Sequence, residues 1–113
     1  MKKLTDLLQI SRYGMGSGNS ELAIQLLGNY LRIINEDNRL PSFIVFYNEG
    51  VKVLEKGSPV VEQLKNLENK GVKLIACGTC LSHYQISEPI AGIKGTMPDI
   101  ITLQSDADKV INL

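Results

Sequence analysis

The sequence predicts an α/β domain of three layers, in which a mostly parallel sheet of about five strands lies between helices. The first observation is that apolar runs of strand length alternate with segments whose apolar residues recur at the helical period. The second is that residues 42–47 and 72–76 are almost continuously apolar, which is typical of strands buried on both faces. Such alternation predicts parallel strands joined by crossover helices on both faces of the sheet.

Length and composition predict a single globular domain over residues 1–113, because 43% of the residues are hydrophobic and 21% are charged. Twelve Lys and Arg balance twelve Asp and Glu, which argues against nucleic acid or an anionic membrane as a partner. No apolar run approaches a membrane span, and the basic residues 1–3 are not followed by the apolar segment of a signal peptide. We therefore expect a cytoplasmic protein, in which a cysteine pair is more often catalytic or metal-binding than a structural disulfide.

The elements follow from local signals along the chain. The strands are expected at 7–10, 42–47, 72–76, 89–93 and 109–113. The helices are expected at 20–34, 58–70, 80–85 and 97–104, with a helical turn at 51–54.

In the first half, the first strand lies within residues 4–11, and a glycine-rich loop follows it. Asn19 is suited to cap the next helix, and Glu21 is favourable in its first turn. The helix ends in the polar segment 35–39. The second strand then ends sharply at the turn 48–50.

In the second half, Ser58 and Pro59 predict a helix start, with Ser58 as the N-cap and Pro59 in the first helical position. Gly71 predicts the end of that helix, because glycine readily adopts the left-handed conformation that follows many helices. Pro98 fits the first turn of the last helix.

In a parallel sheet, every loop that leads from a strand to a helix lies at the carboxyl edge. The segments expected to share this edge are 14–19, 48–51, 77–80 and 95–97. Open α/β sheets bind their ligands at this edge, so the sequence predicts a site there.

Cys77 and Cys80 are the only cysteines of the chain, and they lie in this predicted site. Because a helix N-terminus favours a thiolate, their position between a strand and a helix predicts thiol chemistry such as the passage of a sulfur atom. The alternative is that both are small buried residues without reactivity.

Two other readings of the cysteine pair are less favoured. A closed zinc site usually has four ligands, whereas the chain offers two cysteines and one histidine, so zinc would need an acidic ligand or a second subunit. We expect no metal and no cofactor. A thioredoxin-like dithiol has a similar local context, but that fold places its cysteines after an early strand, and Met97-Pro98 is only a faint counterpart of its cis-proline.

The loop residues Gly78 and Thr79 and the glycines Gly14 and Gly16 are expected to form the wall of the site. The glycine-rich loop lacks both the dinucleotide fingerprint and the P-loop ending, so nucleotide binding is not expected. Its N–H groups are suited to face an anion such as a persulfide.

Three further side chains are candidates for the wall of the site. His83 follows Cys80 by one helical turn and is suited to stabilise a thiolate or carry a proton, although a lone histidine there is more often simply exposed. Asn48 ends the most buried strand, where it would bond a ligand or form the turn, and for its neighbour Glu49 turn formation is favoured. Met97 adjoins the site but is more typical of packing.

Several segments together resemble a known family. They are Gly14-x-Gly16 before an apolar helix, Phe46-Tyr47-Asn48-x-Gly50-Val51-Lys52, Ser58 at a helix start, Gly71-Val72-Lys73-Leu74-Ile75, Cys77-Gly78-Thr79-Cys80-Leu81 and the closing Ala107-Asp108-Lys109-Val110-Ile111. In this order they resemble the DsrE/DsrF-like superfamily over nearly the whole chain. They are most similar to the C-terminal domain of YedF-type proteins, which are described as sulfurtransferase-like selenium metabolism proteins.

The resemblance implies a three-layer fold, frequent homo-oligomers and sulfur relay through a cysteine persulfide, with Cys77 in the position of the relay cysteine. Tyr84-Gln85 stands where many relatives have Arg-Gly, as it also does in YedF-type sequences. YedF-type proteins also carry a TusA-like domain with its own cysteine, which this sequence does not contain. Either a separate carrier provides that function, or this chain has a narrower one.

The expected function is therefore that of a sulfur-relay, sulfurtransferase-like protein in which Cys77 holds sulfur as a persulfide and Cys80 resolves it or assists release. The expected partners are a second copy of the chain and a TusA-like carrier or a cysteine desulfurase. The alternative is a binding or regulatory module for a small ligand or a partner protein, with unreactive or redox-switch cysteines.

Overall fold

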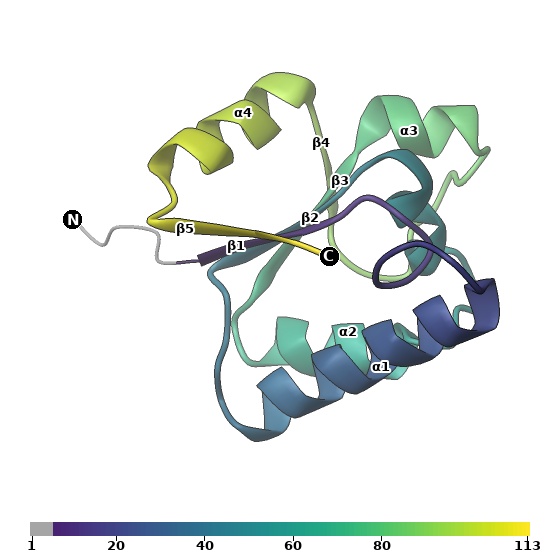
Figure 1. Cartoon of the computed structure of the whole chain (residues 1–113). Coiled ribbons are helices and arrows are strands. Elements are labelled where there is room, and N and C mark those ends of the chain that lie inside the picture. The colour runs from purple at the N-terminus through teal and green to yellow at the C-terminus, as the bar shows by residue number, and fades with distance from the viewer. Residues whose placement is uncertain (1–5) are drawn as a thin grey trace.

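The computed structural model describes residues 6–113 and shows one sheet of five parallel strands in the order β4-β3-β2-β1-β5 (Figure 1). The strands are β1 (Asp6–Ile10), β2 (Phe43–Phe46), β3 (Lys73–Cys77), β4 (Ile93–Gly95) and β5 (Lys109–Asn112). The helices are α1 (Ser20–Glu36), the 3₁₀ helix η1 (Asn48–Leu54), α2 (Val61–Asn69), α3 (Gly78–His83) and α4 (Met97–Asp106). The predicted three-layer α/β fold with five strands is therefore confirmed.

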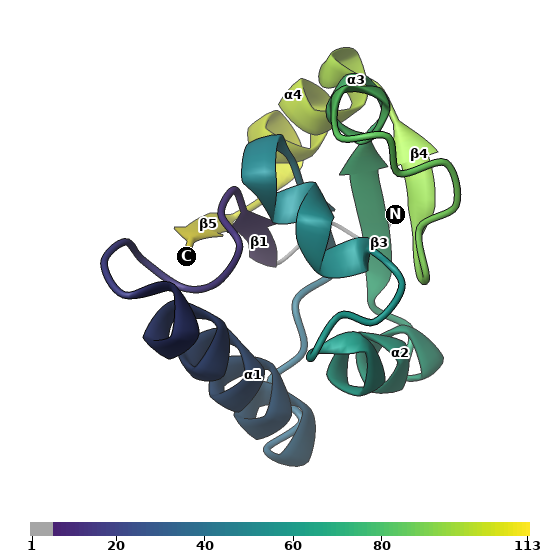
Figure 2. The ribbon, with the colours of Figure 1, turned by 90° about the vertical axis from the view of Figure 1, so that its right-hand side faces the viewer.

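The strand order explains how the helices are distributed over the sheet. From β1 to β4 the chain moves in one direction across the sheet, so right-handed crossovers place three connections on the same face. The return from β4 to β5 runs the other way and places α4 on the opposite face. Figure 1 accordingly shows α1 and α2 below the sheet and α4 above it, and Figure 2 shows α3 and η1 from the carboxyl edge.

Two apolar cores of unequal size result from this arrangement. The larger core lies on the face of α1 and α2, and it also takes in Ile86 and Ala91 from the connection between α3 and β4. The smaller core lies under α4. Its buried residues are Leu7, Val45, Cys77, Ile100 and Leu103.

The face under α4 is only partly covered. Figure 1 shows α4 running along the strands, and a helix is only about 10 Å wide with its side chains, whereas five strands span about 19 Å across the sheet. The cross-strand row of Val45, Ile75 and Ile93 shows the result, because exposure rises from 0% at Val45 through an intermediate value at Ile75 to 66% at Ile93. One half of this sheet face therefore remains apolar and open.

The predicted ends of two helices are confirmed by their backbone hydrogen bonds. Asn19 caps α1, because its side chain accepts a hydrogen bond from the backbone N–H of Leu22. Gly71 has a φ of +101° and follows α2, where the N–H of Val72 donates to the carbonyl of Leu67, as in a Schellman motif.

Other boundaries differ from the prediction. Ser58 and Pro59 precede α2, which begins at Val61; the Ser58 hydroxyl accepts from the N–H of Val60, so it forms a turn before the helix and does not cap it. The prediction that Ser58 is the N-cap is therefore wrong, because its hydroxyl is engaged in this turn and the helix begins three residues later. The fourth strand lies at Ile93–Gly95, so the predicted range 89–93 overlaps it only at Ile93.

Smaller shifts affect the remaining elements. α3 begins two residues earlier than predicted, directly after Cys77, and η1 includes the residues predicted as a turn at 48–50. The start of the first strand at residue 4 and the absence of a signal segment near residues 1–3 concern positions outside the described residues.

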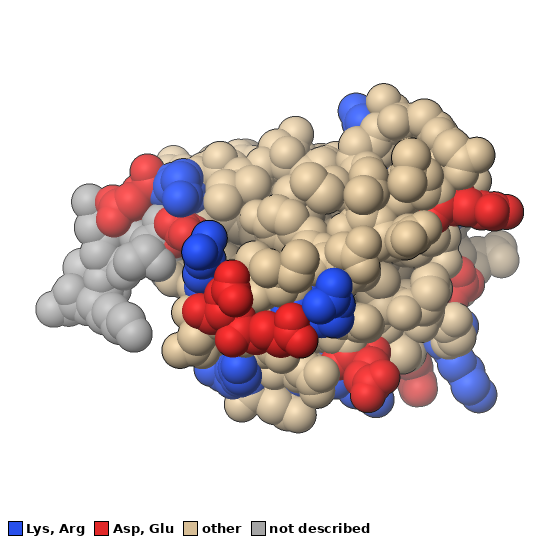
Figure 3. All heavy atoms as spheres, turned by 60° about the horizontal axis from the view of Figure 1, so that its bottom comes forward, with Lys and Arg blue, Asp and Glu red and all other residues tan. Residues whose placement is uncertain are grey.

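Figure 3 shows the side of the molecule that carries α1 and α2. Acidic and basic side chains lie next to one another there. This side shows no patch of a single sign within residues 6–113. None of the helices in the described part of the chain is both long and apolar enough to cross a membrane.

Candidate functional site

Cys77 is held in a buried position at the carboxyl end of β3. It is the last residue of the strand, and its extended backbone conformation leads directly into α3. Its side chain is only 3% exposed, in the small core under α4. The alternation of the strand explains this, because Ile75 and Cys77 both point to the face of α4.

Cys80 lies one helical turn further on and is partly exposed. It packs against both cores of the molecule. Burial and the neighbouring Cys77 thiol raise the pKa of the Cys80 thiol, while a hydrogen bond from the backbone N–H of Asn48 acts in the opposite direction. The net direction is upward, so the Cys80 thiol stays protonated to a higher pH than an ordinary thiol.

The hydrogen bond from Asn48 joins the loop after β2 to the cysteine pair. Its N–H donates to the Cys80 Sγ, with a distance of 3.1 Å between the two atoms. Asn48 has a φ of +52°, a left-handed conformation that asparagine adopts more readily than most residues. Gly50 packs so closely on the Ile10 carbonyl that no side chain fits, which fixes η1 against the end of β1. Asn48 thus contributes its backbone N–H to the cysteine pair.

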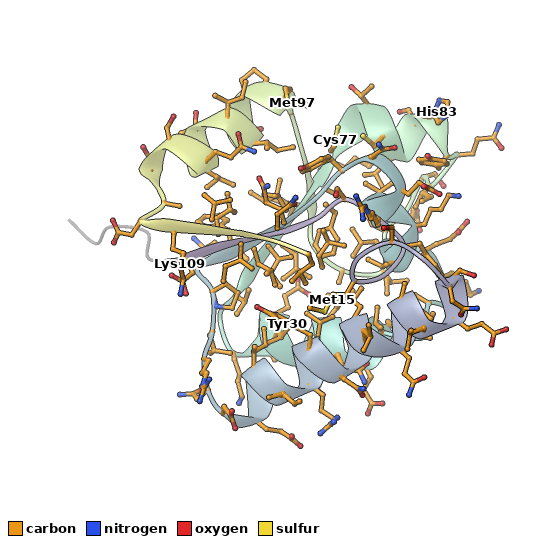
Figure 4. The ribbon with its side chains drawn as sticks, in the orientation of Figure 1. Met15, Tyr30, Cys77, His83, Met97 and Lys109 are labelled. Carbon is orange, nitrogen blue, oxygen red and sulfur yellow. The ribbon has the colours of Figure 1, made fainter. Side chains whose placement is uncertain are left out.

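The loop between β4 and α4 lies beside the cysteine loop. Cys77 pairs with Gly95 in the register of the sheet, and a Cβ on Gly78 would lie 3.3 Å from the Gly95 carbonyl oxygen. Met97 begins α4 and is 51% exposed, and Figure 4 shows it at the same end of the sheet as Cys77. The structure therefore brings Cys77, Cys80, Asn48, Gly78 and Met97 into one region.

The other predicted wall residues lie further from the sulfur atoms. Met15, between Gly14 and Gly16, packs against the larger core, and η1 lies between this loop and α3 in Figures 1 and 2. Gly14 instead fits tightly against Ala23 of α1.

Two wall candidates of α3 are exposed. His83 lies at the end of the helix, where its ring meets the Tyr84 ring edge-on at 4.9 Å (Figure 4). Thr79 is also exposed, in the first turn of α3.

One cavity of the described residues reaches the cysteine loop, and others lie further along the sheet. A cavity of about 620 Å³ borders α3, and Gly78 is the member of the cysteine loop that lines it. Two cavities of about 290 Å³ share Ile75 and Ile93 on the open half of the α4 face. Within residues 6–113, no group of three or more His, Cys, Asp or Glu side chains is arranged to hold a metal ion.

Sequence reasoning did not identify Gly95 as the cross-strand neighbour of Cys77, or Gly50 as the residue that fixes η1. The fourth strand was predicted to begin four residues too early, so Gly95 was placed after the strand and its pairing with Cys77 was missed. Gly50 stood in a segment read as an ordinary turn, and only the close approach of β1 shows why glycine is needed there.

The fold and this edge define an α/β domain of five parallel strands with a two-cysteine loop after the third strand. The sequence matches the DsrE/DsrF-like family over residues 2–113, and the chain belongs to this family.

Solved structures agree on the fold. YchN from E. coli superposes with a TM-score of 0.75 at 17% identity, covering 97% of this chain and 99% of that one. The protein BT1422 of unknown function from Bacteroides thetaiotaomicron has a TM-score of 0.66 at 14% identity, with coverages of 96% and 94%. MTH1491 from Methanobacterium thermoautotrophicum, also of unknown function, has a TM-score of 0.64 at 20% identity, with coverages of 94% and 98%. No curated protein is significantly similar to the chain in sequence.

Proposed function

We propose that this protein is a sulfur-relay protein that carries sulfur as a persulfide on the Cys77–Cys80 pair. The family suggests a role in sulfur relay in general. The observation that supports the specific proposal is the pair itself, in which two thiols lie together at the carboxyl edge and a backbone N–H donates to one of them. In the proposed relay Cys77 holds the sulfur, as the family resemblance implies.

The transfer needs no oxidant. A thiolate of the pair attacks the outer sulfur of a donor persulfide, a new S–S bond forms, and the donor leaves as a thiolate. In release, an acceptor thiolate attacks the outer sulfur in the same way. Alternatively, Cys80 attacks the Cys77 sulfur, expels hydrosulfide and leaves a disulfide, which a dithiol reductant then reopens.

The proposed partners are a sulfur donor or acceptor, such as a cysteine desulfurase or a TusA-like carrier, and a second copy of the chain. The open half of the α4 face supports the second copy, because Ile93 is exposed there and lines both cavities, and Ile101 and Met97 are exposed on the adjoining helix α4. The rims of these cavities carry two acidic and two basic residues, a balance that suits contact between identical surfaces. These residues are Glu68, Lys73, Lys94 and Asp99. We propose the cytoplasm as the location, on the cysteine usage alone.

Intact-protein mass spectrometry tests the relay. The protein is incubated with a cysteine desulfurase and cysteine, and the expected result is a gain of one sulfur atom that a reductant removes. The double variant Cys77→Ala/Cys80→Ala should gain none, while Ser82→Ala, an exposed change in the same helix, should gain sulfur as the wild type does. A wild-type protein that gains no sulfur would contradict the proposal.

The alternative is a binding or regulatory module. The observation that favours it is that the cavity of about 620 Å³ is lined by Gly78 and by neither sulfur. In that case both cysteines would be replaceable by alanine without loss of function, and the cavity beside α3 would be the site to probe.

A further inference from the structure

The two thiols of the pair differ in how easily another molecule reaches them. Cys77 is 3% exposed and lies among Val45, Ile100 and Leu103, whereas Cys80 is partly exposed on α3. A donor persulfide belongs to another molecule, and its sulfur must come within bonding distance of the attacking thiolate. Access therefore favours Cys80 as the first point of contact.

The backbone around Cys80 also favours negative charge on its sulfur. The N–H of Asn48 donates to this sulfur at 3.1 Å, and the left-handed backbone of Asn48 aims it there. A fixed N–H donor stabilises a thiolate wherever charge develops on that atom. It therefore assists Cys80 both when it attacks and when it leaves.

We propose that Cys80 receives the sulfur from the donor and passes it to Cys77, and that the N–H of Asn48 stabilises Cys80 as nucleophile and as leaving group. The proposal rests on the sulfur relay proposed above. It assigns the two cysteines successive roles, with Cys80 as the receiving thiol and Cys77 as the holding thiol.

The two steps balance without a further reactant. In the first step the Cys80 thiolate attacks the outer sulfur of the donor, so that Cys80 becomes a persulfide and the donor leaves as a thiolate. In the second step the Cys77 thiol gives up its proton to solvent and attacks the same outer sulfur, and Cys80 leaves as a thiolate. One S–S bond forms and one breaks in each step, and the number of oxidised sulfur atoms stays constant.

The raised pKa of Cys80 predicts how the first step depends on pH. Burial and the neighbouring Cys77 keep this thiol protonated to a higher pH than usual, so fewer molecules carry the attacking thiolate at neutral pH. Loading should therefore accelerate as the pH rises above neutrality. Replacing Cys77 lowers the pKa of Cys80 and should shift the acceleration to lower pH.

Loading rates of single variants test the order of the two cysteines. Wild type, Cys77→Ser, Cys77→Ala, Cys80→Ser and the control Ser82→Ala are mixed with cysteine persulfide, and the added sulfur is followed by intact-protein mass spectrometry. Both Cys77 variants should still gain one sulfur atom, whereas Cys80→Ser should load at least about tenfold more slowly than wild type. Cys77→Ala is included because the hydroxyl of Cys77→Ser could disturb the apolar core around residue 77, whereas alanine adds no polar group.

The outcomes separate this inference from the relay itself. Loading of Cys80→Ser at the wild-type rate would overturn the inference, and so would loss of loading in folded Cys77 variants while wild type loads. If wild type itself does not load, the relay fails, and the inference fails with it.

The amide signal of Asn48 provides a second test, because it would not respond to the ionisation of Cys80 if the Asn48 N–H only helped to hold the fold. In a ¹H–¹⁵N spectrum this signal should titrate with the ionisation of Cys80 and shift again when sulfur is loaded. The titration should persist in Cys77→Ala and disappear in Cys80→Ser. An Asn48 signal that is constant in wild type across this titration would contradict the assigned role of its N–H.

Discussion

The two faces of the sheet are built from the same strands but are covered very differently. On one face α1, α2 and the connection after α3 enclose a large core, and on the other α4 alone packs on the sheet in a core of five buried residues. The cause is topological, since only the return from β4 to β5 crosses the second face. Most buried apolar residues therefore lie on the first face, whereas the thin second core contains Cys77.

The first prediction compares the two cores through matched leucines. Leu27→Ala in α1 should lower the free energy of unfolding by about 2–5 kcal/mol, because the side chain is fully buried and leaves a cavity. Leu103→Ala in α4 should cost less, at about 2 kcal/mol, because the thin core relaxes more easily. Urea denaturation of both variants measures the difference. Equal losses would show that the second core is as tightly packed as the first.

The second prediction concerns the cap of α4. The Thr96 hydroxyl accepts from the N–H of Asp99, and the Asp99 carboxylate accepts from the N–H of Thr96, so each group satisfies the other. Thr96→Ala should cost about 1 kcal/mol and increase hydrogen exchange in α4 more than elsewhere. Asn19→Ala, which removes the cap of α1, is the matched control and should leave exchange in α4 unchanged.

The same cap predicts a pH effect with a defined sign. Hydrogen bonds from Thr96 lower the pKa of Asp99 below its usual value. A carboxyl with a lowered pKa in the folded state adds stability above the unfolded pKa of about 3.9, and this is lost as the pH falls through the folded value. The stability of Asp99→Asn should therefore depend less on pH across this acid range, as measured by thermal unfolding.

The third prediction tests which apolar surface meets a second copy of the chain. Ile101 on α4 and Leu22 on the outside of α1 are both 53% exposed, so they form a matched pair. Each change to Ser should alter stability by less than about 0.5 kcal/mol. Ile101→Ser should reduce the mass measured by light scattering, and Leu22→Ser should not. A reduction by Leu22→Ser alone would move the contact to α1.

The smallest predicted effect concerns the pH dependence of thiol alkylation at Cys80, which packs against both cores. Alkylation of Cys80 should reach half its maximal rate above the ordinary thiol value of about pH 8.5, because burial and Cys77 raise its pKa. Cys77→Ala should lower this midpoint, since it removes the neighbouring thiol. A midpoint unchanged by the substitution would show that Cys77 does not influence Cys80.

Much of the fold was predictable from local signals. The cap at Asn19, the helix end at Gly71 and the strand expected at 72–76 each depend on neighbours within a few residues. The structure confirms the cap and the helix end, and it places the strand one residue later, at Lys73–Cys77. The start at Ser58 and the fourth strand were misplaced. At Ser58 a turn and a helix cap have the same local signature, and a three-residue edge strand has too few residues to show a period.

The sequence alone determined the class of fold, the carboxyl-edge position of the cysteine pair and the family resemblance. These follow from alternation, from glycine and proline positions and from the order of short motifs, which are all local properties of the chain. Only the tertiary structure decided that Cys77 is buried while Cys80 is partly exposed, that Asn48 contributes its N–H, and that Gly95 lies beside Cys77. Each of these depends on contacts between residues far apart in the sequence, and such contacts exist only once the strands have found their order in the sheet.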